Sequence, residues 1–79
     1  MQEQLETRLR VLHLRQAELV ARVEELETRW ARLLVAGLVD QAGTVESLLE
    51  GVRADLARVG MEAARTAEVL GRWKSEKAG

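Results

Sequence analysis

The chain contains no cysteine, no proline, no phenylalanine and no tyrosine. The lack of cysteine excludes both a disulfide framework and a thiolate metal site. Leucine, alanine, valine, glutamate and arginine are the dominant residues, and this composition is typical of long helices and coiled coils. The composition therefore points to an all-α protein without covalent cross-links.

Long apolar runs are missing as well. The longest, residues 33–39, is broken by Gly37 and is far too short to cross a bilayer. The first residues, Met-Gln-Glu-Gln, lack the basic start and apolar core of a secretion signal. We therefore expect no membrane segment and a cytoplasmic location, with a nuclear location as the alternative.

Neither sign of charge is in excess, because 12 lysines and arginines offset 13 aspartates and glutamates to give a net charge of −1. This balance argues against a protein whose main partner is rich in phosphate. At 79 residues the chain has room for one small domain, whose core alone is only marginally stabilising. A homo-oligomer or a complex with a partner protein is therefore expected.

Leucine recurs at every seventh position along the first half of the chain. The repeat comprises Leu5, Leu12, Leu19, Leu26 and Leu33. Five further positions complete an alternation of four-residue and three-residue steps: Leu9, Gln16, Val23, Trp30 and Gly37. This spacing is typical of a helix that lies along another helix. We predict this helix over about residues 3–39.

A turn at residues 40–43 and a second helix over about residues 44–74 are predicted next. The turn segment breaks the period, and its Gly43 can adopt a left-handed backbone conformation. Thr44 is placed to cap the second helix, with Glu46 in its first turn. The stripe of this helix comprises Val45, Leu49, Val52, Leu56, Val59, Ala63, Thr66, Leu70 and Trp73.

The two stripes can be paired by folding the chain about Gln41, so that paired residue numbers sum to 82. Leu26 then faces Leu56, and Gln16 faces Thr66 as the only polar pair of the seam. A hydrogen bond between these two polar side chains would penalise slipped registers. We therefore predict one domain over residues 1–79, an antiparallel coiled-coil hairpin.

Five flanking pairs of opposite charge support this register. They are Arg8–Glu76, Arg22–Glu62, Arg29–Asp55, Glu6–Lys74 and Glu27–Arg53. Exposed pairs contribute only about 0.2–1 kcal/mol each, so their value lies in discriminating between registers. The alternative is a parallel zipper of the first helix from two chains, which would place Trp30 against its own copy.

Small and apolar residues fill one flank of the predicted hairpin. They are His13, Ala17, Val20, Leu34 and Leu38 of the first helix and Ala57, Gly60, Ala64, Ala67 and Gly71 of the second. Small side chains let another backbone approach closely, and the larger apolar ones would otherwise add an exposed patch. We predict a second interface here, in a four-helix bundle of two hairpins or with a partner's helix. The alternative is a solvated flank that tolerates alanine and glycine.

No chemistry is expected of this chain. His13 is its only histidine, and with Glu6 and Glu24 as the nearest carboxylates it makes a poor metal site. The sequence shows no nucleophile–base constellation and no glycine-rich phosphate loop. We predict no catalytic residue, no metal, no cofactor and no small-molecule substrate.

Regularly spaced arginines raise the question of nucleic acid. They are Arg8, Arg15, Arg22, Arg29, Arg58, Arg65 and Arg72. The predicted architecture is similar to that of the small plasmid RNA-binding hairpin dimers, without a shared motif. Ion pairs within and between the helices account for most of these arginines, so nucleic-acid binding is the least favoured of three functions.

The segment Leu5-Glu6-Thr7-Arg8-Leu9 resembles the short helical-hairpin co-chaperones of bacterial type III secretion systems. Five residues of an amphipathic helix assign no family, and the resemblance implies only a small adaptor that holds a partner's helix. The function predicted first is a self-associating protein–protein interaction or assembly module, with the adaptor second.

Overall fold

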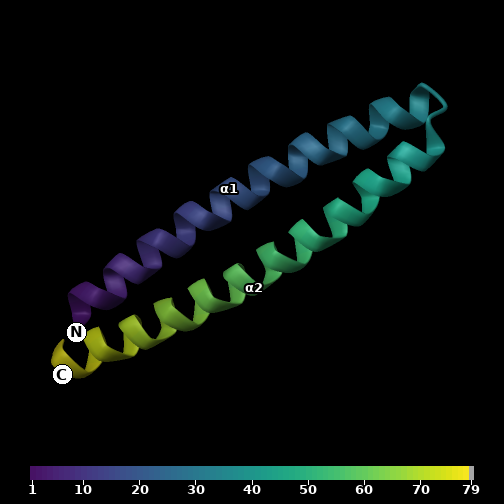
Figure 1. The fold of residues 1–79 in the computed structure, drawn as a ribbon. Helices are drawn as coiled ribbons and strands as arrows, with labels where there is room; N and C mark the ends of the chain where they lie inside the picture. The colour runs from purple at the N-terminus through teal and green to yellow at the C-terminus, as the bar shows by residue number, and fades with distance from the viewer. Residues whose placement is uncertain (79) are drawn as a thin grey trace.

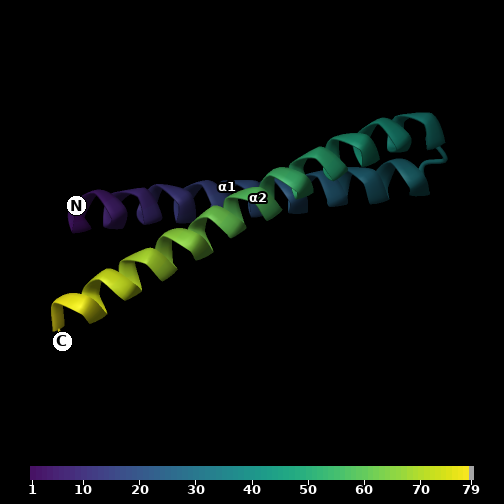
Figure 2. The same ribbon diagram turned by 90° about the horizontal axis from the view of Figure 1, so that it is seen from below.

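The computed structural model describes residues 1–78, with side chains up to residue 76. Helix α1 spans Gln2–Val35 and helix α2 spans Val39–Ala78. They run in opposite directions and cross at a shallow angle (Figures 1 and 2), within a rod of 62 × 14 × 14 Å. The prediction of an all-α antiparallel hairpin is confirmed. Within the described part of the chain, neither helix is apolar enough over a sufficient length to cross a membrane.

The turn between the helices lies at residues 36–38 and is built on a glycine. Gly37 has a φ of 78°, in the left-handed region that favours glycine. Its N–H donates to the carbonyl of Leu34 at 3.0 Å, and the N–H of Leu38 donates to that of Leu33 at 2.9 Å. These two bonds form a Schellman motif, which ends α1 sharply.

The predicted turn at residues 40–43 is therefore wrong, because this segment begins α2. Thr44 does not cap a helix; its hydroxyl donates to the carbonyl of Asp40, 3.3 Å away inside α2. Gly37 provides the left-handed residue earlier in the chain than predicted. Starting α2 early also buries Ala42 and Val45, which are only 1% and 6% exposed. At its other end α2 continues beyond the predicted limit at residue 74.

The seam between the helices is shifted by one heptad from the predicted register. Leu26, which is fully buried, packs with Val45 and Leu49, seven residues before its predicted partner Leu56. Half-buried side chains surround this cluster: Val23, Trp30, Leu33 and Val52. The shift follows from the earlier turn, since a hairpin closed at Gly37 brings an earlier part of α2 against each residue of α1.

The predicted hydrogen bond between Gln16 and Thr66 does not form in this register. The Thr66 hydroxyl instead donates to the carbonyl of Glu62 in its own helix, at 2.8 Å. The Gln16 amide nitrogen lies 3.5 Å from the position that a Cβ on Gly60 would occupy. No buried side-chain nitrogen or oxygen among the described residues lacks a hydrogen-bond partner.

The residues of the predicted seam nevertheless all face the opposite helix to some degree. Six are buried: Leu19, Leu26, Leu49, Ala63, Thr66 and Leu70. The others are half-buried: Leu5, Leu9, Leu12, Gln16, Val23, Trp30, Leu33, Val52, Leu56, Val59 and Trp73. A slip by one heptad therefore exchanges the partners of these residues without removing any of them from the seam.

Candidate functional site

Two ion pairs join the helices along one flank of the hairpin. Near the open end Lys74 Nζ lies 3.5 Å from Glu6 Oε1, and nearer the turn an Arg53 nitrogen lies 3.1 Å from Glu27 Oε1. Both pairs were predicted from the sequence and are confirmed. Between these two pairs the same flank positions recur at seven-residue steps. On α1 they are His13 and Val20, and on α2 they are Gly60 and Ala67.

The exposed surface between the ion pairs is the candidate functional site, which we call the central face. It consists of His13, Ala17 and Val20 of α1 and Ala57, Gly60, Ala64, Ala67 and Gly71 of α2. Each member lies one helical turn or one heptad from another member or from an ion-paired residue, so all of them share this flank. All are exposed except Gly60, which is half-buried beneath the Gln16 amide.

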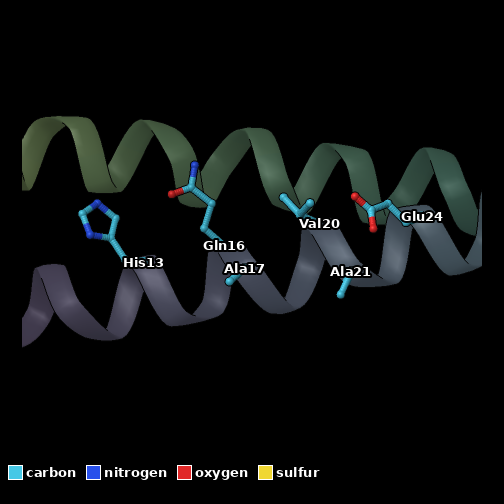
Figure 3. A pocket seen from close by; sticks show the side chains of 6 residues that line it. All are labelled: His13, Gln16, Ala17, Val20, Ala21 and Glu24. Atoms are coloured by element: carbon cyan, nitrogen blue, oxygen red, sulfur yellow. The ribbon is translucent and has the colours of Figure 1, made fainter.

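A shallow hollow opens along the α1 side of the central face (Figure 3). Its lining consists of His13, Gln16, Ala17, Val20, Ala21 and Glu24. The Gln16 side chain extends from α1 towards α2, where the missing side chain of Gly60 leaves room for it. Ala21 and Glu24 were not among the predicted interface residues, although both lie one helical turn from a predicted member, Ala17 or Val20.

Two predicted interface residues, Leu34 and Leu38, lie apart from the central face. The Glu27–Arg53 ion pair stands between them and Val20. Leu38 belongs to the turn, where its N–H completes the Schellman motif. Both remain 41–44% exposed, so they form a separate apolar patch at the turn end of the rod.

The opposite flank carries most of the arginines, and carboxylates surround them. Neighbours on the same helix pair Arg15 with Glu18, Arg22 and Arg29 with Glu25, Arg58 with Asp55, and Arg72 with Glu68. Arg8 reaches across to Glu62 at 3.9 Å. The predicted pairs Arg8–Glu76, Arg22–Glu62 and Arg29–Asp55 are therefore wrong, because Arg8 contacts Glu62 and both Arg22 and Arg29 contact Glu25 instead.

Most of the ionisable side chains form ion pairs on the surface, and the surroundings of one of them, Glu6, shift its pKa. The pKa of the Glu6 carboxyl is lowered, first by the hydrogen bond that the Gln2 amide donates to it at 3.1 Å and then by the charge of Lys74. No group of three or more histidine, aspartate or glutamate side chains in the described part of the chain could hold a metal ion.

No known family model, curated protein or solved structure matches this chain. A functional proposal therefore has to be built on the geometry of the central face.

Proposed function

We propose that the protein is a non-enzymatic assembly module that associates with a second copy of itself through the central face. The observation that carries the proposal is the distribution of charge around α2. Between Arg53 and Lys74, the flank that faces His13 and Val20 carries only alanine and glycine. Four charged residues of the same stretch lie on other sides of the helix, namely Asp55, Arg58, Glu62 and Arg65, while the ion-paired Glu68 and Arg72 border the flank beside Ala64 and Gly71.

The isolated hairpin also leaves much apolar surface in water. A two-helix rod can cover each helix on one side only, and Val20 and Leu14 remain 41% and 65% exposed. Burial of apolar surface contributes about 25 cal/mol per Å², and short chains have little of it to gain from their own fold. A second layer of helices supplies the missing burial, as in a four-helix bundle.

The test is the oligomeric state of the protein in solution. Sedimentation equilibrium over a range of protein concentrations is expected to show a dimer for the wild type. Ala64→Glu places a carboxylate on the central face at an exposed position. A buried polar group without a partner costs about 1–3 kcal/mol, and a charged one costs more; a dimer contains two of them, so association should weaken by at least about tenfold.

A matched pair of glycine substitutions separates the interface from helix stability. Gly71→Glu lies on the central face and Gly51→Glu lies on the flank shared with Arg58 and Arg65, and both positions are exposed with nothing within 4 Å of the added Cβ. Gly71→Glu should weaken dimerisation with unchanged helicity by circular dichroism, and Gly51→Glu should remain a dimer. A monomeric wild type, or equal association of the two variants, would contradict the proposal.

A further inference from the structure

We infer that the second copy docks antiparallel on the central face, about a two-fold axis that passes beside Ala17. In this arrangement α1 stacks on α1 and α2 on α2, and Arg10 of each chain meets Glu24 of the other. The inference rests on the proposed self-association and adds its orientation, its register and the charges that select them.

The charges of α1 are placed symmetrically about Ala17. Arg10 lies one heptad before it and Glu24 one heptad after it, on the same face of the helix. Neither side chain takes part in the ion pairs formed within the described residues. An antiparallel copy of α1 centred on Ala17 therefore brings each Arg10 opposite a Glu24, twice per dimer.

The side chains between these charges are also compatible with the two-fold axis. Ala17 meets its own copy, which lets the helices approach closely. On either side of Ala17, Val20 of one chain packs against His13 of the other, and Leu14 packs against Ala21 of the other. No charged residue therefore lies at the centre of the interface. Leu14 is 65% exposed in the single hairpin, and the dimer covers part of its surface.

The other face-to-face arrangement, with the two hairpins parallel, gives a worse match of charge. It stacks α1 of one chain on α2 of the next at the same height along the rod. Because Leu26 lies level with Leu49, Glu24 would then lie opposite Glu50, which shares the flank of Ala57. Like charges across an interface are unfavourable, so the charge pattern selects the antiparallel dimer.

The dimensions of the rod also suit a full-length antiparallel dimer. α1 runs from Gln2 to Val35, so Ala17 lies close to its midpoint and the two copies overlap along almost the whole helix. The whole face of the rod, 62 × 14 Å, measures about 870 Å², so a full-length contact reaches the roughly 800 Å² that each partner contributes to a standard stable interface.

Reversal of the two charges tests the register directly. Arg10→Glu and Glu24→Arg each convert two attractive contacts into two repulsive ones, and each should weaken dimerisation by about tenfold. The double variant Arg10→Glu/Glu24→Arg restores opposite charges and should return the dissociation constant to within about threefold of the wild type. Arg65→Glu, an equal change of charge on the opposite flank, is the control and should leave dimerisation unchanged.

A single introduced cysteine tests the orientation, because the chain has none of its own. Ala17→Cys should form a disulfide-linked dimer under oxidising conditions, since the two-fold axis places this residue against its own copy. Ala31→Cys should not, because about 40 Å separates it from its own copy in this arrangement. If Arg10→Glu leaves the dissociation constant unchanged and Ala17→Cys does not cross-link the dimer, the proposed orientation is wrong although the protein still self-associates. A wild-type monomer overturns both.

Discussion

The half of the hairpin near the turn and the half near the open end bury different kinds of residue. Near the turn, Leu26, Val45 and Leu49 form a cluster of large apolar side chains. Towards the open end the buried residues of α2 are Ala63, Thr66 and Leu70, of which one is small and one is polar. The seam leucines of α1 in this second half are only half-buried: Leu5, Leu9 and Leu12.

This difference shows where the register of the hairpin is decided. Each buried methylene group contributes about 0.8 kcal/mol, so the cluster near the turn outweighs the alanine and threonine positions of the open half. A cluster that begins directly after Gly37 also closes the shortest loop, which has the smallest entropic cost. We therefore expect the turn half to hold the register and the open half to follow it.

The largest effect is expected from removing equivalent leucines in the two halves. Leu49 and Leu70 occupy the same heptad position of α2 and are 4% and 7% exposed. Leu49→Ala should lower the free energy of unfolding by about 2–5 kcal/mol, and Leu70→Ala by about half as much, since frayed ends relax around a cavity. Urea denaturation at one fixed protein concentration measures both losses. Equal losses would show that the two halves are equally well packed.

The identity of the seam residues could be predicted from the sequence, but their partners could not. The alternation of four and three residues selects the buried stripe of each helix. Slipping an antiparallel pair by seven residues keeps every stripe residue in the seam, so periodicity alone cannot choose between Leu49 and Leu56 as the partner of Leu26. The choice depends on the turn, and polar residues at positions 40–43 resembled a turn more than the apolar surroundings of Gly37 did.

Local signals for the true turn are present in the sequence. A glycine followed by an apolar residue, here Gly37 and Leu38, is the pattern of the Schellman motif. Asp40 then lies in the first turn of α2, where an acidic residue is favourable. The central face could be predicted from spacing for the same reason as the seam, and the Glu27–Arg53 pair that separates Leu34 from it was predicted too, whereas the place of Leu38 in the turn follows only from the correct turn.

Two glycine substitutions with opposite expected effects on the free energy of unfolding test the role of the turn. Gly37→Ala forces alanine into a left-handed conformation and should lower the free energy of unfolding by about 1–2 kcal/mol. Gly51→Ala adds a Cβ at an exposed helical position with nothing within 4 Å, and should raise it by about 0.5–1 kcal/mol. Thermal or urea unfolding by circular dichroism gives both signs. A neutral Gly37→Ala would mean that the turn does not depend on a left-handed residue.

The smallest expected effect on the free energy of unfolding is its loss in acid through Glu6, at the open end of the hairpin. The Gln2 amide, and after it Lys74, lowers the pKa of Glu6, so the folded state holds its proton less tightly than the unfolded chain does. The resulting stabilisation is complete above the unfolded pKa of Glu6 and is lost as the pH falls through the lower folded pKa. Glu6 is only half-buried and its partner Lys74 is exposed, so the loss should be small and should be reduced further by salt.

Nuclear magnetic resonance can follow this titration at the Glu6 carboxyl carbon. Gln2→Ala and Lys74→Met should each raise the midpoint, because the hydrogen bond from Gln2 and the charge of Lys74 both lower the pKa of Glu6. Amide exchange at the same pH should accelerate around Glu6 while the amides around Leu26 stay protected, since the ion pair lies at the end of the hairpin that buries the smaller side chains. Uniform acceleration along both helices would instead show that the rod opens as one cooperative unit and that its two halves share their stability.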